Sequence, residues 1–577
     1  MASGRWTVLS ALIAFVHALT AQELKPIIRI EGVKEELRRN IQAHLSLLNE
    51  DCTSPNWRLK DAMTSSESEI RQALRALGYY RPSIRSKFQF TPPCWQAEFT
   101  IESGVRVMLA QVDVQVLGEA ANDPEFQALL AQLPLKSSDP LDHGRYEDLK
   151  SRLTNLAEQR GFFDARLVKH ELIVDPSQNL AWIRLHLDSG RRYTIGKIDL
   201  LQEVLNPEFV RRYFPFEPGD PYTSTQLTKT YQILADSGYF EDVEVRALRD
   251  QLADFQIPIR IRLLARKRHF FKAGAGFDTN TGPRVLLGYE NRRLNPYGHR
   301  LDLQARFSPV RSELNGQYVI PWQKPAEETL SFQTGYLHEE TDTLRTDSAA
   351  LGARFLHLRR TIQETLGLDL RYESSRFHDA DVQGVLLLIP SVQWGYVKAD
   401  DRLRPKRGFK SDISLKGGVS LLGNPVRFFQ AQGYVKGVYQ FPWLGRVLSR
   451  LEAGATFTDH FVNLPASFRF LAGGDTSLRG YGYKRLGPKN RKGEVVGGRY
   501  LGVASLEYEQ LFLRNWGASL FVDAGNAFMT WDEPIQVGAG LGIRWYSPVG
   551  PLRLDLAVPV TKARFELRVH VSMGAEL

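Results

Sequence analysis

Long apolar runs are scarce in this chain of 577 residues, which argues against a bundle of membrane-spanning helices. After residue 21 the longest run is GVLLLIPSV at 384–392, far short of the ~20 residues that a spanning helix needs. Residues 1–21 combine one arginine, a short apolar stretch and small residues ahead of Gln22. We therefore expect them to be a signal peptide for export, the alternative being a buried N-terminal helix.

Cysteine is also scarce, with Cys52 and Cys94 as its two copies. There is no CxxC pair and no His/Cys cluster, so we expect no zinc site and no bound metal ion. Export places the chain in an oxidising compartment, where an even pair of cysteines usually forms a disulfide. The sequence predicts a bond between Cys52 and Cys94, and two buried thiols are the alternative.

Motifs of enzyme chemistry are missing as well. The chain has no GxSxG, no HExxH and no P-loop sequence. The segment GAGLGIR at 538–544 has the glycines of a nucleotide-binding loop, but no helical pattern follows it. We interpret it as small residues within a strand, and we expect no enzymatic activity and no cofactor.

Net charge gives little support to a nucleic-acid partner. The formal net charge is +9, but the basic residues are scattered along the chain, and an exported protein meets little DNA. Two local clusters, ARKRHFFK at 265–272 and GPKNRKGE at 487–494, are either solvated loops or segments close to anionic lipid headgroups. For the chain as a whole we expect outer-membrane lipid, and no nucleic acid, as a partner.

A weak repeat organises the first half of the chain. Three segments each show a helical apolar pattern, then a glycine, a pair of aromatic residues and a short strand. The glycines are Gly78, Gly161 and Gly238, at spacings of 83 and 77 residues, and each suits the left-handed end of a helix. A period near 80 residues is the size of a small domain, so the repeat predicts three tandem α+β modules.

The second half, from about residue 270, alternates apolar and polar residues instead. The last such segment, FELRVHVSM at 565–573, places Phe565, Leu567, Val569, Val571 and Met573 on one face. Segments of this kind recur over some 300 residues, with turn residues between them, which is typical of a transmembrane β-barrel. The length predicts about 16 antiparallel strands, and a soluble β-sandwich is the alternative.

The modules resemble POTRA domains, which are periplasmic β-α-α-β-β units. The segment FRFLAGGDTSLRGYGYKRLGP at 468–488 resembles the hallmark loop of the superfamily of outer-membrane assembly and two-partner-secretion proteins that includes BamA and TamA. Four further stretches resemble sequences of the same superfamily: DDRLRPKRG at 400–408, GGRYLGVASLEYE at 497–509, FVDAGNAF at 521–528 and GAGLGIRWYSPVGPLRLDLAVPV at 538–560. In length and module count the chain is most similar to the TamA members.

The resemblance implies a domain plan. After the signal peptide at 1–21, we expect POTRA modules at 22–104, 105–189 and 190–265, followed by an all-β transmembrane barrel of about 16 strands at 266–577.

The resemblance also implies a site inside the barrel. In that superfamily the loop that carries the Arg479–Gly480–Tyr481 motif folds back into the lumen, where its arginine contacts an aspartate on the inner wall. On this chain Arg479 would meet Asp523. A buried arginine costs several kcal/mol unless it is paired, and a carboxylate supplies charge-assisted hydrogen bonds. The alternative is an arginine exposed on a surface loop.

A second expected feature is the seam, where the first strand, near 270–278, would pair with the last strand, 565–573, and close the barrel. Gly274 and Gly276 in the first strand and Gly574 after the last one would weaken this contact. Weakly held strand edges can template added strands. The alternative is that these glycines relieve crowding in a curved sheet.

These features lead to one functional hypothesis. We expect an outer-membrane assembly factor, located in the outer membrane of a Gram-negative bacterium with its POTRA domains in the periplasm. It would help to insert, fold or translocate outer-membrane proteins such as autotransporters. The resemblance implies unfolded outer-membrane protein clients and a TamB-like partner anchored in the inner membrane. The alternatives are a two-partner-secretion transporter for one passenger and a passive pore.

Overall fold

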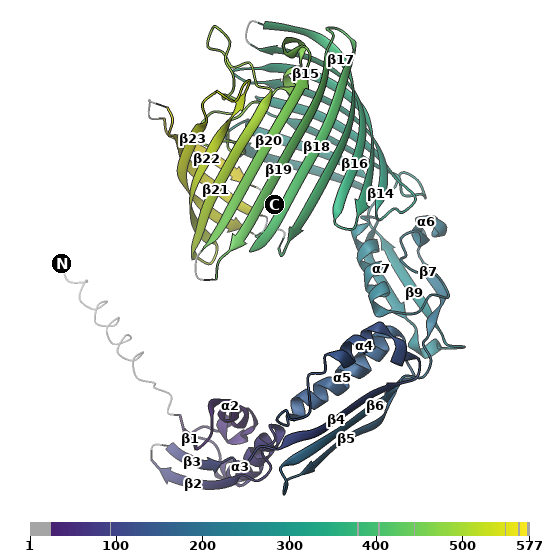
Figure 1. The fold of residues 1–577 in the computed structure, drawn as a ribbon, viewed down its shortest axis with the longest axis vertical. Helices are drawn as coiled ribbons and strands as arrows, with labels where there is room; N and C mark the ends of the chain where they lie inside the picture. The colour runs from purple at the N-terminus through teal and green to yellow at the C-terminus, as the bar shows by residue number, and fades with distance from the viewer. Residues whose placement is uncertain are drawn as a thin grey trace, which may run out of the picture. The chain divides into compact units, whose positions relative to one another are not determined.

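The computed structural model describes residues 25–92, 94–377, 380–401, 404–442, 445–547, 550–562 and 566–573 (Figure 1). The predicted signal peptide lies outside these residues, as do Phe565 and Gly574 of the predicted seam. None of the helices in the described part of the chain is long and apolar enough to cross a bilayer.

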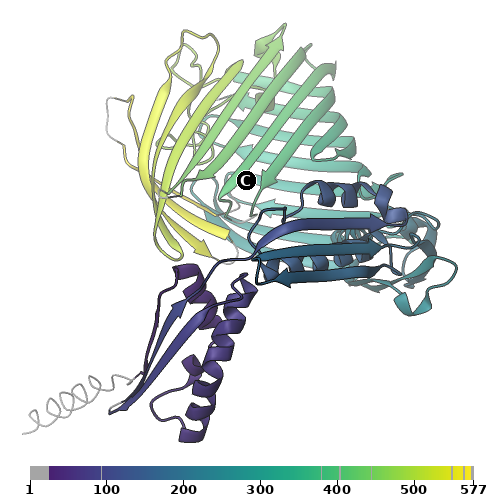
Figure 2. The same cartoon turned by 60° about the horizontal axis from the view of Figure 1, so that its bottom comes forward.

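The first half contains three modules of one topology: strand, helix, helix, strand, strand. In each sheet the third strand lies between the other two. In the first two modules it pairs in parallel with the first strand and antiparallel with the second. The two helices lie along one face of the sheet, as the first two modules show (Figure 2). This is the β-α-α-β-β plan that the sequence predicts.

The bounds of the module elements are as follows. The first module comprises β1 (Ile27–Glu31), α2 (Glu35–His44), η1 (Ser46–Asn49), α3 (Asn56–Ala76), β2 (Ser83–Thr91) and β3 (Cys94–Glu102). The second comprises β4 (Met108–Leu117), η2 (Glu119–Asn122), α4 (Pro124–Ala131), α5 (His143–Arg160), β5 (Arg166–Asp175) and β6 (Leu180–Asp188). The third comprises β7 (Thr194–Leu201), α6 (Pro207–Arg211), α7 (Ser224–Asp236), β8 (Phe240–Ala247), η3 (Arg249–Gln251) and β9 (Gln256–Ala265).

The three repeated glycines follow the second helix of each module, and all have left-handed backbone conformations. Their φ angles are +89° at Gly78, +85° at Gly161 and +81° at Gly238. At Gly161 this conformation caps α5, and its N–H bonds back to the carbonyl oxygens of Ala157 and Glu158. Glycine adopts these angles without steric cost, so the residue type and the end of the helix have one cause.

The predicted disulfide is present. Cys52, in the loop before α3, is bonded to Cys94, the first residue of β3, with an S–S distance of 2.04 Å. It joins two segments of the first module that lie 42 residues apart in sequence.

The second half forms one antiparallel sheet of 16 strands, paired in sequence order from β10 to β25 (teal to yellow in Figure 1). This confirms the predicted strand number. The strands are β10 (His269–Asp278), β11 (Gly282–Asn291), β12 (Arg300–Phe307), β13 (Arg311–Pro321), β14 (Glu328–Glu340), β15 (Arg345–Arg359), β16 (Ile362–Phe377), β17 (Ala380–Ala399), β18 (Arg407–Leu422), β19 (Arg427–Gln440), β20 (Arg446–Thr458), β21 (Tyr500–Leu513), β22 (Trp516–Phe528), β23 (Gln536–Ser547), β24 (Gly550–Pro559) and β25 (Arg568–Met573).

Side chains alternate between the two faces of this sheet. In β22, Leu520 and Val522 are 61% and 50% exposed, whereas Phe521 and Asp523 are buried. Outward apolar and inward polar residues are the pattern of a barrel that meets lipid on its outside.

The seam between the first and last strands differs from the prediction. Among the described residues no strand pairing joins β10 to β25, although the two strands run close together. Between them lies a cavity of about 690 Å³, lined by Gly274 and Gly276 on one side and Val571 and Ser572 on the other. The first and last strands therefore lie next to each other without the ladder that closure of the barrel would require.

Candidate functional site

A long loop, residues 459–499 between β20 and β21, carries the sequence motif that the resemblance singled out. It includes two short turns of helix, η4 (Phe461–Asn463) and η5 (Ala466–Phe468). Leu478 and Tyr481, near the middle of the loop, are 0% and 1% exposed. The loop is therefore enclosed, although its length would allow it to extend into solvent.

Arg479 and Asp523 lie in direct contact. The guanidinium Nε and Nη2 of Arg479 donate to Oδ2 and Oδ1 of Asp523 at 2.8 and 2.9 Å. The backbone N–H of Arg479 donates to Oδ2 of the same carboxylate at 3.0 Å. Arg479 is 6% exposed and Asp523 is fully buried. A two-point guanidinium–carboxylate pair fixes orientation as well as charge.

The pair belongs to a larger buried charge cluster, which spans the inner faces of β21 to β24. Nη1 of Arg479 also donates to Glu507 at 2.8 Å and to Asp555 at 3.1 Å. Arg544, itself fully buried, contacts the same two carboxylates at 2.6 Å each. Two guanidinium groups thus neutralise most of the charge of three carboxylates, which satisfies the rule that buried charges are paired.

Gly480 and Tyr481 place the loop against the last strands of the sheet. The backbone N–H of Gly480 donates to Nε2 of His570 on β25 at 3.2 Å. Gly480 has φ +90°, and a Cβ on it would lie 2.9 Å from the carbonyl carbon of Val558. The hydroxyl of Tyr481 lies 2.7 Å from the hydroxyl of Thr561. Glycine is needed at 480 for both its backbone angle and its close approach to the wall.

The loop is also bound to the opposite part of the inner wall. Ser467 donates through its backbone N–H and its hydroxyl to Glu373 on β16, at 3.1 and 2.5 Å. Lys484 donates to both oxygens of Glu339 on β14, at 2.7 and 2.9 Å. Asp475 accepts a hydrogen bond from Asn280, in the turn between β10 and β11. The loop therefore bridges both sides of the barrel.

The seam residues that the sequence singled out lie as follows. Gly274 and Gly276 of β10 and Val571 of β25 line the cavity between the two strands. Leu567 and Val569 are 57% and 48% exposed, as expected for apolar residues on the outer face. Among the described residues there is no group of three or more His, Cys, Asp or Glu side chains that could hold a metal ion.

Comparison with known families gives this arrangement a context. Residues 297–576 match the Omp85 superfamily domain, residues 27–103 match the POTRA domain described as TamA domain 1, and residues 193–262 match a POTRA family described as the surface antigen variable number repeat.

The chain belongs to the Omp85 superfamily.

Two curated relatives carry the name outer membrane protein assembly factor BamA. The one from Nitratidesulfovibrio vulgaris is 23% identical over 375 residues, which cover 62% of this chain and 47% of the relative. The one from Neisseria meningitidis serogroup B is 22% identical over 542 residues, which cover 81% of this chain and 66% of the relative. This Omp85 chain therefore spans about half to two thirds of the length of these relatives.

The fold of the Omp85 chain is similar to a crystal structure of BamA from Haemophilus ducreyi that lacks POTRA domains 1–3. The TM-score is 0.54 at 16% identity, and the match covers 96% of this chain and all of the other. The chain is an outer-membrane β-barrel protein whose N-terminal POTRA modules lie in the periplasm.

Sequence reasoning named Arg479 and Asp523 but missed four residues around them: Glu507, Arg544 and Asp555 of the charge cluster, and His570, which accepts the hydrogen bond from Gly480. A usable signal was present. Each of the four is a polar residue at an inward position, next to exposed apolar neighbours such as Leu506 and Ile543. What the sequence did not show is that the four strands present these residues at one height, because that depends on the register between strands.

Proposed function

We propose that this Omp85 protein is a TamA-type assembly factor, which helps outer-membrane proteins such as autotransporters to insert and fold. The observation that carries the proposal is the seam: a 16-strand barrel whose first and last strands lie side by side without a ladder between them. A strand edge with free backbone groups can accept a strand of another chain. The work of insertion would then come from the folding of the client itself.

The anchored loop supports this proposal over a passive pore. A pore needs an open lumen, whereas residues 459–499 are bound to the inner wall on β14, β16 and β21 to β24. A loop fixed in this way occupies the lumen that a passive pore would have to keep open.

The POTRA modules would supply the docking surface for periplasmic partners. The middle sheet has β4 and β5 as its edges, and β5 exposes Val168 and Ile173, each 45% exposed. Edge strands of this kind can pair with an extended segment of an unfolded client or of a TamB-like partner. Capture of such a partner by the full-length chain from a membrane extract, and its loss when β5 carries a proline, would support this part of the proposal.

A crosslink across the seam tests the insertion mechanism. Cysteines at Ala275 and Val571, joined by a short bis-thiol reagent, would hold β10 and β25 together, because both residues line the cavity between the strands. In proteoliposomes, the locked protein should lose its ability to speed the insertion of an unfolded client barrel, as measured by protease protection of the client.

The matched control joins two strands that are already paired. Ala431 and Ala455 face each other on β19 and β20, so a crosslink between cysteines at these positions changes no movement that insertion needs. This control should keep full activity. Unimpaired insertion by the seam-locked protein would refute the role of the seam.

A further inference from the structure

A group of cations lines the inner wall of the barrel away from the loop arginine. Two adjoining cavities, of about 310 and 200 Å³, lie over β13 to β18. They share Arg354, Asp369 and Arg371 in their linings. The charged residues that line the two cavities together are four cations, Arg311, Arg354, Arg371 and Lys416, and two carboxylates, Glu313 and Asp369.

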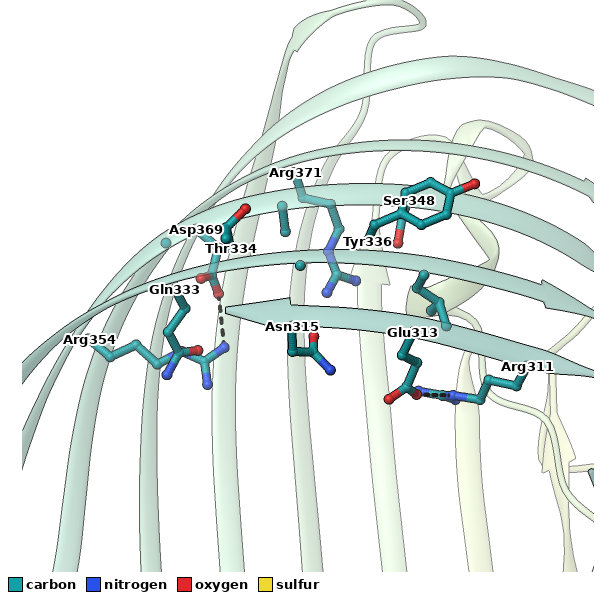
Figure 3. Close-up of a pocket in the computed structure, with 14 residues that line it drawn as sticks. Arg311, Glu313, Asn315, Gln333, Thr334, Tyr336, Ser348, Arg354, Asp369 and Arg371 are labelled. Carbon is teal, nitrogen blue, oxygen red and sulfur yellow. Dashed lines mark hydrogen bonds and ion pairs between the residues drawn. The ribbon is translucent and has the colours of Figure 1, made fainter. Parts of the chain in front are cut away.

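Both carboxylates already have a cation beside them. Arg311 bonds to Glu313, and Nη2 of Arg354 lies 3.6 Å from Oδ2 of Asp369. Figure 3 shows Arg354 and Asp369 at the left and Arg311 and Glu313 at the right, with the side chain of Arg371 between the two pairs. Among the lining residues the cations therefore outnumber the carboxylates by two, and Arg371 and Lys416 are the two cations without a paired carboxylate in the lining.

Neither of these two groups is fully satisfied by the protein. Nη1 of Arg371 has two long contacts, 3.4 Å to the hydroxyl of Ser467 and 3.9 Å to Glu373. Its Nε is buried and has no hydrogen-bond partner among the described residues. The side chain of Lys416, which lines the smaller cavity, makes no hydrogen bond or close ion pair among the described residues, and Asp369 and Asp412 act on it only at longer range. A half-buried cation without a close, hydrogen-bonded counterion is unfavourable, and a bound anion would supply one.

We propose that these cavities form a binding site for a phosphoryl oxyanion. The donors come from several strands: Arg371 on β16, Lys416 on β18, and the hydroxyls of Thr365, Ser391 and Ser414. Donors that approach from three or more directions match the tetrahedral oxygens of a phosphate better than the two coplanar oxygens of a carboxylate. The site goes beyond the proposed assembly function, which does not require it.

The position of the site favours a soluble phosphate over a lipid headgroup. Lys416 lies on the inner face of β18, because its neighbours in the alternating pattern, such as Ile413 with 48% exposure, face outward. On β16, Leu368 and Leu370 face outward in the same way and leave Asp369 and Arg371 inside.

Equilibrium dialysis of the full-length protein in detergent, against labelled inorganic phosphate at constant ionic strength, tests the proposal. We expect saturable binding at one site per chain, and binding at least about tenfold weaker in Lys416→Gln, because a charge-assisted hydrogen bond is lost. Lys416→Arg, which keeps the charge, should retain binding. This second variant separates the loss of an anion contact from a general loss of folding.

The matched control is Lys410→Gln. Lys410 lies on the same face of the same strand, six residues away, and lines neither cavity. Phosphate binding should be unchanged in it. If the protein binds phosphatidic acid vesicles but not inorganic phosphate, the site still recognises a phosphoryl group, and its ligand is a lipid headgroup. An equal loss in both glutamine variants, binding of an acidic peptide in place of phosphate, or no saturable phosphate binding in either form would overturn the proposal.

Discussion

The buried guanidinium of Arg479 holds the loop of residues 459–499 to the inner wall of the barrel. All three of its nitrogens donate to side chains on β21, β22 or β24, and its Cζ lies 3.4 Å from the ring centroid of Phe521. Removing such a charge from water costs several kcal/mol, which the surrounding carboxylates offset only together. The loop is therefore held at one residue by four strand residues.

The charge count of the cluster makes a specific prediction about Arg479 and Asp523. Arg479→Ala leaves three carboxylates with one guanidinium, whereas Asp523→Ala leaves two of each. Breaking a buried pair typically costs about 3–5 kcal/mol of unfolding free energy. We expect the loss to be larger for the arginine variant, and the two losses to be non-additive in the double variant, as measured by urea unfolding of the refolded barrel.

Arg491→Ala, an exposed arginine of the same loop, serves as the control and should change the stability little. Strict additivity of the Arg479 and Asp523 losses would show that their contact contributes nothing specific.

A second residue, His143, predicts how the stability of the POTRA segment depends on pH. Its Nε2 lies 2.7 Å from the hydroxyl of Tyr80. Burial lowers the pKa of His143 below its ordinary value of 6.5, and the nearby Asp142 and Glu147 oppose this shift only in part. The unfolded chain therefore binds the proton more readily than the folded one.

The sign follows from this difference. Above pH 6.5 both states are neutral at His143 and the residue adds no pH dependence. As the pH falls through 6.5 toward the lowered folded pKa, the unfolding free energy decreases, and the decrease ends below that value. We expect His143→Gln to remove this step from the unfolding free energy measured between pH 7.5 and 5.5. His170→Gln, at an exposed position on β5, should leave the step in place.

Hydrogen bonds connect the loop of residues 459–499 to strands on both sides of the seam. The loop reaches β25 through the bond from Gly480 to His570, and the turn after β10 through Asp475 and Asn280. These two contacts lie on opposite sides of the seam. The loop thus links two strands that have no ladder between them.

Two glycines of this loop offer a matched test of close approach. Gly480 and Gly493 both have left-handed φ angles, +90° and +83°. A Cβ at Gly480 would lie 2.9 Å from the backbone of Val558, whereas a Cβ at Gly493 would meet nothing within 4 Å. Alanine at 493 should cost about 1 kcal/mol from backbone strain alone. Alanine at 480 should cost clearly more, because the loop must also move away from β24.

Both variants can be compared by urea unfolding and by the insertion assay in proteoliposomes. Equal losses of stability would mean that the approach of Gly480 to the wall is not important.

The whole molecule consists of two compact units. One contains the first two modules and part of the third, and the other contains the rest of the third module with the barrel. In the second unit the hydroxyl of Tyr239 donates to the carbonyl oxygen of Gly298, in the turn between β11 and β12, at 2.5 Å. The part of the third module that belongs to this unit is therefore bonded to the barrel.

Loss of the disulfide should destabilise the first module without lowering the stability of the barrel. Replacing Cys52 and Cys94 together with serine should lower the unfolding free energy of the first module by about 2–4 kcal/mol, because the loop between them is no longer closed in the unfolded chain. The buried core of that module consists of residues between 30 and 101 in the described part of the chain, so the barrel should unfold as before. Protease digestion of the first module and urea unfolding of the barrel measure the two effects separately. A parallel loss of barrel stability would contradict the division.

Much of this architecture was predictable from the sequence because it depends on local periodicity. The glycines at 78, 161 and 238 predicted where helices end, since the left-handed cap is a property of a single residue. The alternation in 565–573 and similar segments predicted the strands and their outward faces, and β25 begins at Arg568. The partner of Arg479 came from the family resemblance and from the cost of burying an unpaired charge.

By itself, the sequence determined the order of three POTRA modules and a 16-strand barrel, the disulfide, and the identity of the loop that carries Arg479. The tertiary structure alone decided that Glu507, Arg544 and Asp555 converge on this arginine, that His570 binds Gly480, and that β10 and β25 are left unpaired. The reason is physical. Periodicity and capping are set by neighbours along the chain, whereas charge clusters and the closure of a barrel depend on the register and curvature of strands far apart in sequence.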